Sequence, residues 1–407
     1  MNAGTGGAAW SAPLWRSGFR PFFLLGALHG PLALAVWLVV FTGMWDPPPM
    51  PIAPALWHGH EMVFGFLSAI ISGLLLTALP SWAGVPEQTG RRLALLVAAW
   101  LAGRVAMASV AAVPAALVAV IDVAALPLLC ALLLPDLLRA RQRKFTAILP
   151  VLFALAIANA AFHVALARGD AEAASTALVS AVAFIVVLYS LVGGFMTPVF
   201  TNNALRDQGS AHRAWRHRRL DLCAHAFAIA FAVTQATATS PRLGAAIAAG
   251  AAIVHAVRLA GWNGWRVRGQ PMVSAMHAGY AWLVVAFLLA AVVPFVPGVG
   301  ARDWLHAMTV GAIGLMMLAL MPRVSLRHTG RGLALSPWIV ASYGVMTAAV
   351  VLRLAFNVPN APLWVAAAGA LLWAACFVIY LAVHAPMLVT PSLPRVPLEP
   401  SPAPRNL

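Results

Sequence analysis

Charged residues are scarce in this sequence. Only 9% of the 407 residues are charged and only 11 are acidic, whereas a soluble globular protein carries about a quarter charged residues. Hydrophobic residues account for 62% of the chain. Because so few charges cannot cover a water-facing surface, most of the exterior must face lipid. The composition therefore excludes an ordinary soluble protein.

Cysteine is nearly absent as well. The three cysteines, Cys130, Cys223 and Cys376, are odd in number, widely spaced, and located in or beside apolar runs. This pattern excludes a disulfide framework and a zinc ribbon. We expect all three to be small apolar residues buried in the protein.

Apolar runs long enough to cross a membrane recur along the whole chain, each with about 20 mainly apolar residues. We therefore predict an all-α, polytopic integral membrane protein with about 12 transmembrane helices. The run at 175–201 offers two points for a break, Gly193–Gly194 and Pro198. The predicted spans are 22–42, 61–83, 92–110, 112–135, 147–167, 175–201, 221–238, 241–261, 273–293, 303–322, 336–356 and 361–384.

The positive charges support this count and orient the chain. Of the 26 Lys and Arg residues, 21 fall near the two chain ends and in alternate loops. The other loops hold only Arg168, Arg242, Arg302 and Arg353, and Arg104 lies inside a span. Cytoplasmic loops of membrane proteins carry such an excess of cations. Both termini are therefore predicted to be cytoplasmic.

The net charge of +15 could also suggest a nucleic-acid partner. The cations, however, form short clusters between apolar runs instead of one basic face or arm. Clusters of this kind lie beside anionic membrane lipid. We predict contact with membrane lipid and no nucleic-acid partner.

The chain shows one domain and a tail. Residues 1–390 are predicted to form a single transmembrane helical domain, without a soluble domain or an obvious internal repeat. Residues 391–407 are rich in Pro and lack apolar periodicity, so we expect a disordered cytoplasmic tail.

Histidine is the residue type that points to chemistry. Ionisable residues at membrane depth are costly and usually face a bundle interior or a functional site. The predicted topology sorts the 12 histidines by depth. An outer layer comprises His58, His60, His163 and His306. An inner layer comprises His29, His225, His255, His277 and His384. Basic loops hold His212, His217 and His328, which we expect to be solvated.

A single histidine within a membrane often does no more than bridge two helices by a hydrogen bond. Two layers that contain four and five histidines favour a role as metal ligands instead. Imidazole suits haem iron, copper and zinc alike. The outer layer is therefore the candidate metal-binding set, and the inner layer could hold a haem that relays electrons.

The segment Trp57–Met62, with the sequence WHGHEM, is the richest in candidate groups. Its histidines, His58 and His60, are two residues apart and so do not share a helix face. Glu61 follows directly. It could orient a ligand histidine, carry protons, or interact with the positive N-terminal end of its helix. We take Glu61 as the candidate catalytic proton carrier.

Three further polar residues lie inside spans. Asn159 is four residues before His163, so the two share one face of the fifth span. Asp122 lies deep in the fourth span, where it is either a neutral hydrogen-bonded group or part of a proton relay. Arg104, in the third span, could pair with Asp122 or with a haem propionate.

Several longer motifs point to a family. They are FRPFF at 19–23, WHGHEMVFGF at 57–66, GGFMTPVFTNN at 193–203, HAMTVGAIG at 306–314 and RVSLRHTGR at 323–331. From about Leu14 to the last span, the chain resembles the NnrS family of bacterial inner-membrane proteins, which contain haem and copper and respond to nitric oxide. It departs from the family pattern at Phe195, where the pattern has Arg, so we assign no role to that position.

The resemblance implies a multi-pass protein of the bacterial inner membrane that carries haem b and copper. Our first hypothesis is that the outer histidines bind these metals and that nitric oxide is reduced there to nitrous oxide, with electrons from a donor that the sequence does not identify. A second is a non-catalytic protein that binds nitric oxide or repairs iron centres under nitrosative stress. A third is a transporter of a metal or a haem-related species, because twelve spans and helices broken by Gly or Pro are typical of transporters.

Overall fold

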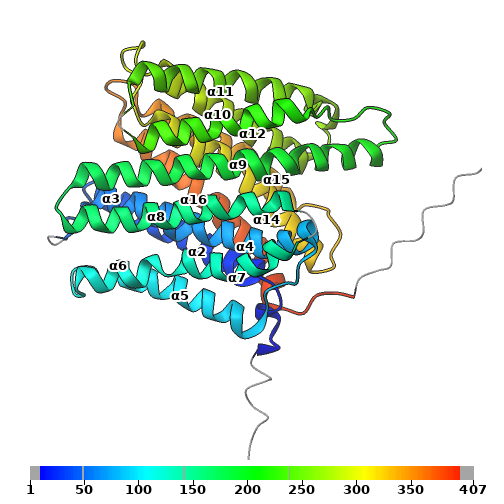
Figure 1. Cartoon of the computed structure of the whole chain (residues 1–407), viewed down its shortest axis with the longest axis horizontal. Coiled ribbons are helices and arrows are strands. Elements are labelled where there is room, and N and C mark those ends of the chain that lie inside the picture. The colour runs from blue at the N-terminus through cyan, green and yellow to red at the C-terminus, as the bar shows by residue number, and fades with distance from the viewer. Residues whose placement is uncertain (1–9, 48–49, 141–142, 238, 395–407) are drawn as a thin grey trace, which may run out of the picture.

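The computed structural model describes residues 10–47, 50–140, 143–237 and 239–394. Over these residues the regular structure is helical, without a strand. The long helices lie side by side in one bundle (Figure 1). The prediction of an all-α, polytopic architecture is confirmed.

The long helices form twelve units. Two of them contain π-helical segments: α3, η2, α4 and η3 run on from Pro54 to Gly84, and α13, η6 and α14 run on from Asp303 to His328. The other units are α2 (Phe19–Phe41), α5 (Gly90–Ala108), α6 with α7 (Ala115–Arg139), η4 with α8 (Arg143–Ala167), α9 (Ala171–Asp207), α10 (Arg218–Ala236), α11 (Pro241–Gly261), α12 (Pro271–Val292), α15 (Pro337–Ala355) and α16 (Leu363–Val389).

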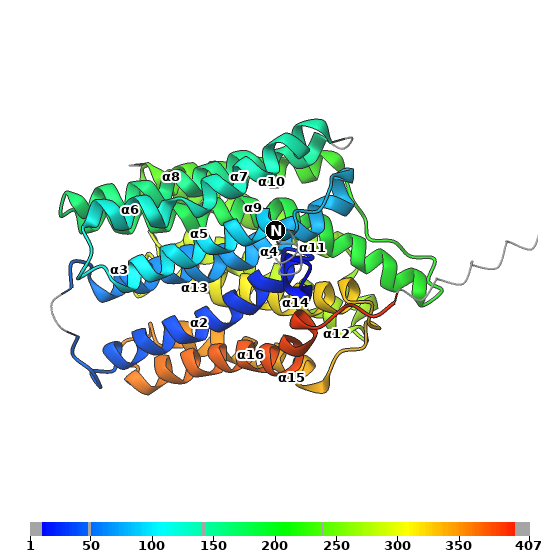
Figure 2. The ribbon, with the colours of Figure 1, turned by 90° about the horizontal axis from the view of Figure 1, so that it is seen from below.

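Among the described residues, ten of these units are long and apolar enough to cross a membrane. The remaining two, α5 and α10, are more polar. Helix α5 begins with Gly90 followed by Arg91–Arg92 and also contains Arg104, while α10 begins with Arg218–Arg219 and has Asp221 in its first turn. Both nevertheless run along the bundle beside their neighbours, α5 against α6 and α10 against α9 and α11 (Figures 1 and 2).

The connections between successive units fall at two ends of the bundle. One end carries the connections α2–α3, α5–α6, α8–α9, α10–α11, α12–α13 and α15–α16. The opposite end carries the remaining connections, the start of α2 and the end of α16 (Figure 2). We call them the arginine-poor and the arginine-rich end, because the first holds Arg168, Arg242, Arg302 and Arg353 and the second most of the other cations.

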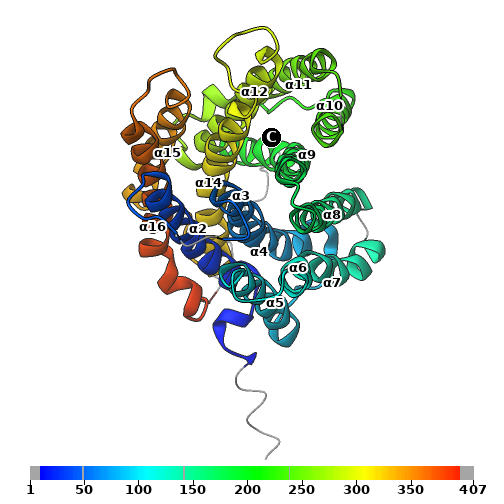
Figure 3. The ribbon, with the colours of Figure 1, turned by 90° about the vertical axis from the view of Figure 1, so that its left-hand side faces the viewer.

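Three units form the centre of the bundle. In the apolar windows of Pro54–Gly84, Ala171–Asp207 and Asp303–His328, 94%, 78% and 78% of the residues are buried, against 28–50% in the other seven candidate spans. The view from the arginine-poor end shows the other helices arranged around them (Figure 3). Side chains on these three units therefore have the least contact with lipid.

Helix α9 is continuous, so neither of the two possible breaks occurs. It runs from Ala171 to Asp207 through Gly193–Gly194 and Pro198. The Asp170 side chain caps its first turn by accepting a hydrogen bond of 2.8 Å from the Ala173 amide. Gly194 instead leaves room for Arg258, whose guanidinium group packs against the helix at this point and would clash with a Cβ atom there.

Two central units contain a wider, π-helical segment. It spans Glu61–Leu67 in one unit and Ala307–Ile313 in the other, and each segment directly follows a histidine. Such π-bulges are rare and are common at functional sites. In the first, the carbonyl of Gly65 accepts a 3.1 Å hydrogen bond from the Trp100 indole in addition to the bond from the Ser68 amide.

The two ends of the chain meet at the arginine-rich end. Arg20, predicted as a loop cation, is buried and donates hydrogen bonds of 2.8 Å to the carbonyl oxygens of Leu388 and Thr390 at the end of α16. Of the predicted tail, the structure describes 391–394, where Leu393 donates a backbone hydrogen bond to Thr329. Residues 395–407 lie outside the described part.

The three cysteines are free, but they are not all buried as expected. Cys376 is buried, Cys130 is partly buried and Cys223 is exposed. In a bundle whose surface is apolar, an exposed cysteine on a helix can still face lipid. Its exposure does not conflict with the membrane assignment.

The orientation of the bundle is tested by labelling single cysteines. In a variant without the native cysteines, Met44→Cys lies at the arginine-poor end and Gln208→Cys at the arginine-rich end, and both positions are exposed. A membrane-impermeant maleimide added to intact cells should label Met44→Cys only, with Gln208→Cys labelled after permeabilisation. Equal labelling of both from outside would contradict the predicted topology.

Candidate functional site

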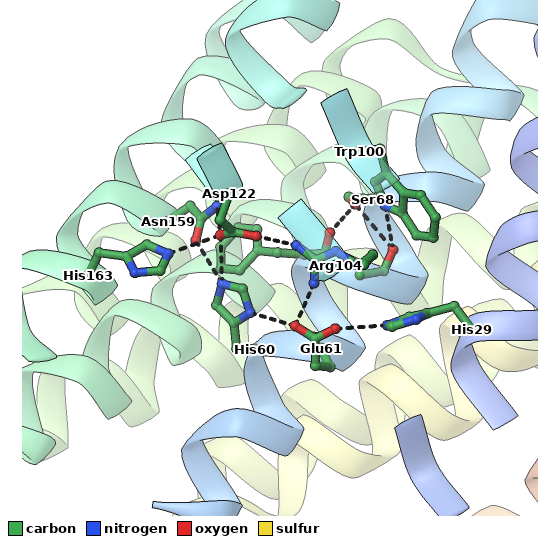
Figure 4. Close-up of polar contacts among 11 residues, drawn as sticks. His29, His60, Glu61, Ser68, Trp100, Arg104, Asp122, Asn159 and His163 are labelled. Atoms are coloured by element: carbon green, nitrogen blue, oxygen red, sulfur yellow. Dashed lines mark hydrogen bonds and ion pairs between the residues drawn. The ribbon is translucent and has the colours of Figure 1, made fainter. Parts of the chain in front are cut away.

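A buried cluster of polar side chains lies between α3 and the helices α2, α5, α6 and α8 (Figure 4). We call it the polar cluster. Six of its seven side chains are at most 9% exposed, although the surrounding helices are apolar. Its members are His29, His60, Glu61, Arg104, Asp122, Asn159 and His163.

Arg104 stands at the centre of this cluster, between two carboxylates. Its Nη1 atom lies 2.5 Å from Oε1 of Glu61, and its Nη2 atom pairs with Oδ1 of Asp122. The sequence left open whether Arg104 pairs with Asp122 or with a haem propionate, and in the structure it pairs with Asp122. A contact between Arg104 and a haem propionate stays a prediction.

His60 has an acceptor at each ring nitrogen. Nδ1 lies 3.1 Å from Oε1 of Glu61, and Nε2 lies 3.0 Å from Oδ2 of Asp122 and 3.0 Å from Oδ1 of Asn159. His163 approaches the same carboxylate, with its Nε2 atom 3.0 Å from Oδ2 of Asp122. Asn159 and His163 therefore use one helix face, as their spacing predicted.

These atoms form a donor set suited to a metal ion. One ligand atom each from His60, Asp122 and His163 lies within 4.8 Å of the other two. Ligand atoms about 2.1 Å from a metal and at right angles to each other are about 3.0 Å apart, which is the spacing between Asp122 Oδ2 and each imidazole. Two imidazoles and a carboxylate are a common set for a transition metal.

The charges within the cluster also favour a cation. Glu61 and Asp122 contribute two negative charges and Arg104 one positive charge, so the buried cluster carries one net negative charge when the histidines are neutral. A bound metal ion or a proton on a histidine would balance it. With a metal at Nε2, the Nδ1 proton of His60 would point to Glu61, as ligand histidines usually require.

His29 belongs to the same cluster and not to an inner layer. Its Nε2 atom lies 3.0 Å from Oε2 of Glu61, and its ring meets the Trp100 ring edge to face. Gly65 makes this approach possible, because a Cβ atom there would overlap the His29 ring. No pattern in the sequence singles out Trp100 as a site residue.

A cavity of about 710 Å³ lies on the other side of α3. Its walls come from α2, α3, η2, α9, α13, η6, α15 and α16 and are mainly apolar. Two histidines line it, His58 and His306, and the Nδ1 atom of each is buried without a hydrogen-bond partner among the described residues. The His58 ring stacks on Trp37 with centroids 5.0 Å apart.

The predicted outer layer is thus divided between two sites. His58 lines the cavity with His306, whereas His60 joins the polar cluster with His163. The division follows from the two-residue spacing, which places His58 and His60 on different faces of α3. The same helix contributes a ligand-type side chain to both sites.

The other inner-layer histidines do not form one cluster, although His225 and His255 lie near each other. Each has its own hydrogen-bond or stacking partner, and the cavity lining includes none of them. Their use for a second haem stays a prediction. The pairs are His225 with Ser190 (2.9 Å), His255 with Tyr280 (2.7 Å), His277 with Thr201 (2.9 Å), and His384 stacked on Tyr380.

The histidines predicted to be solvated fall into two groups. His212 and His217 are exposed, as expected. His328 is only partly exposed, and its ring lies 5.8 Å from that of Phe19. It ends α14 instead of lying in a loop, so it packs against the bundle.

Two arginines in the cavity lining were overlooked as site residues. Arg302 and Arg353 both line it at the arginine-poor end. The sequence did contain a signal for them, because they are two of the four cations that interrupt the alternation of charge. Because cations are rare at this end of the bundle, an arginine there can indicate a functional site, and these two arginines line the cavity.

Removing the central cation should destabilise the protein. Arg104→Met leaves Glu61 and Asp122 buried without their partner, and breaking a buried pair in this way costs about 3–5 kcal/mol. We expect a clearly lower midpoint of thermal unfolding in detergent. Arg168→Met, at an exposed arginine, should stay within about 0.5 kcal/mol of the wild type. An Arg104→Met protein as stable as the wild type would show that the ion pairs contribute no net stability.

Comparison with known proteins identifies the family. Residues 13–392 match the family model described as NnrS protein, which covers nearly the whole chain, including both candidate sites. No curated protein matches the chain. The expected resemblance is confirmed, and the chain belongs to the NnrS family, membrane proteins linked to nitric oxide and to haem or metal binding.

Proposed function

We propose that this protein binds haem b in the cavity beside His58 and His306 and reduces nitric oxide to nitrous oxide. The observation that carries the proposal is a pair of imidazoles, His58 and His306, in the wall of an apolar cavity, with the Nδ1 atom of His58 buried and without a hydrogen-bond partner among the described residues. A buried polar atom is normally hydrogen-bonded. Two imidazoles that meet at an apolar cavity are therefore best explained by a ligand that they hold there.

The cavity suits haem in size and in chemistry. Its volume of about 710 Å³ lies within the range of about 300–1,000 Å³ typical of cofactor pockets. Imidazole is a common axial ligand of haem iron. Apolar walls such as Phe66 and Trp373 suit the porphyrin faces. The residues present therefore fit the group that the family implies.

The polar cluster is the proposed site of copper. Its two imidazoles and one carboxylate offer nitrogen and oxygen donors, which suit copper as well as iron and zinc. Because His60 and His58 lie on the two sides of α3, the two proposed sites are separated by one helix. In this arrangement, haem in the cavity and copper in the polar cluster would both lie in the arginine-poor half of the bundle.

The proposed reaction consumes two nitric oxide molecules, two electrons and two protons, and it forms one nitrous oxide and one water. Bound haem iron would supply a position in the cavity where the two nitrogens could meet, and copper, one helix away, would take part in supplying the electrons. The protein supplies an apolar cavity that admits small apolar gases from lipid. It also supplies ionisable groups nearby: Glu61 faces the polar cluster, while the next residues, Met62 and Val63, line the cavity.

The proposal places the protein in the bacterial inner membrane with both termini in the cytoplasm. Its electron donor is then a separate redox partner. Experiments can distinguish this proposal from the two alternative functions. A protein that only binds nitric oxide would show its spectrum without forming nitrous oxide, and a transporter would take up its substrate into sealed vesicles. The decisive test is nitrous oxide formation by the purified protein with a chemical electron donor.

The two-site arrangement predicts separable losses of metal. His306→Ala should lower the haem content and keep the copper, since His306 lines only the cavity. His163→Ala should lower the copper content and keep the haem, since His163 lies in the polar cluster. The measurements are the pyridine haemochrome spectrum and elemental analysis. His212→Ala, at an exposed histidine, is the control. Loss of both metals in each variant would contradict two separate sites.

Glu61→Gln tests the proposed proton role. Gln keeps the shape and the hydrogen-bonding ability of Glu but does not titrate. We expect retained haem and copper, retained binding of nitric oxide, and turnover lower by about 100- to 10,000-fold. Glu172→Gln, at an exposed first-turn carboxylate of α9, should change nothing. Near-normal turnover in Glu61→Gln would remove the proton role and leave Glu61 as the group that orients His60.

A further inference from the structure

The polar groups of the cavity are unevenly distributed. His58 and His306 contribute imidazoles, whereas the charged side chains, Arg302, Asp303 and Arg353, come from the ends of helices and loops at the arginine-poor end. Almost all of the remaining lining is apolar. A ligand that fills this cavity is therefore apolar over most of its surface and polar at one edge.

Arg353 is a cation of the cavity wall that has few protein partners for its charge and its N–H groups. It lies in the last turn of α15, is partly buried, and donates one hydrogen bond, of 3.0 Å, from Nη1 to Oδ1 of Asn357. It forms no ion pair with any residue that the structure describes. A guanidinium group has five N–H donors, so most of its donors are free to face a ligand.

The nearby acid, Asp303, lies close enough to interact with the charge of Arg353 but forms no ion pair with it. One carboxylate oxygen of Asp303 accepts the Gly300 amide at 2.9 Å, and the other accepts Nδ2 of Asn357 at 2.5 Å. Asp303 therefore holds Asn357, whose amide oxygen in turn faces Arg353. This chain of contacts fixes the position of the guanidinium group, while the Asp303 carboxylate makes its hydrogen bonds to other groups and not to Arg353.

Arg302 adds a second positive charge at the rim. It is exposed and donates a 2.9 Å hydrogen bond from Nη2 to the Ser175 hydroxyl. Together, Arg302 and Arg353 outnumber the single acid Asp303, so the charged edge of the cavity is positive. It matches a ligand with acidic groups along one edge of an apolar body.

We infer that Arg353, supported by Arg302, binds the propionate carboxylates of the haem. The inference rests on the proposed function, because it assigns an orientation to the cofactor proposed there. The porphyrin would lie with its carboxylates toward the arginine-poor end. Asn357 is a positioning residue, which acts through Arg353.

The test compares Arg353→Gln, Arg353→Lys and Asn357→Ala with the wild-type holoprotein. Arg168→Gln is the matched control, because Arg168 is exposed at the same end and does not line the cavity. Charge-assisted hydrogen bonds contribute enough that haem transfer to apomyoglobin should be about 10- to 100-fold faster in Arg353→Gln. Arg353→Lys, which keeps the charge, should fall between Arg353→Gln and the wild type.

Resonance Raman spectra supply a second readout that a purely structural role would not move. The propionate bending band should shift in Arg353→Gln, shift less in Asn357→Ala, and stay unchanged in Arg168→Gln. An unchanged band and an unchanged transfer rate in Arg353→Gln would overturn the inference while the proposed function stands. Loss of a bound phospholipid from that variant, with haem unaffected, would assign the arginine to lipid and also overturn it. Wild-type protein without haem would overturn the proposed function itself.

Discussion

The ion pairs of Arg104 are the interaction on which the arginine-poor half of the bundle depends. Two carboxylates on neighbouring elements, Glu61 and Asp122, share one guanidinium group at membrane depth. Burying either carboxylate there in its charged form without a cation would be unfavourable, because isolated charges in an apolar medium cost several kcal/mol each. The arginine thereby fixes α5 and α6 against the central unit. It also fixes the direction in which the imidazoles of His60 and His163 point.

The central unit Pro54–Gly84 links the two candidate sites mechanically. His58 and His60 face opposite sides of one short helix, and a π-helical segment follows them directly. A wider turn at this point changes the rotation of every residue that follows. Within this segment the Gly65 carbonyl accepts a hydrogen bond from Trp100, which packs on His29. The geometry of the polar cluster and that of the cavity wall are therefore set by the same few residues.

The sequence alone predicted much of the fold, because the apolar runs and the alternation of charge each report on the spans. It also predicted that Asn159 and His163 share a face, and that Arg104 could meet Asp122, since these follow from helical spacing and from the cost of burial. The cavity could not be predicted. It arises where side chains of eight elements fail to meet, and no local pattern encodes that. Gly193–Gly194 offered a possible break in α9, whereas the structure shows that Gly194 leaves room for the Arg258 side chain of α11, a contact between distant parts of the sequence.

The contact of Arg20 with the end of α16 bears on how the chain is made. Arg20 begins the first span, while its acceptors, Leu388 and Thr390, are among the last residues of the membrane domain. During synthesis, Arg20 therefore lacks these carbonyl acceptors until nearly the whole polypeptide has been made. Helices α2 and α16 also pack against each other. The ring of helices therefore closes only at the end of synthesis, and a chain truncated before α16 would present an open bundle with an exposed cation to the quality-control proteases of the membrane.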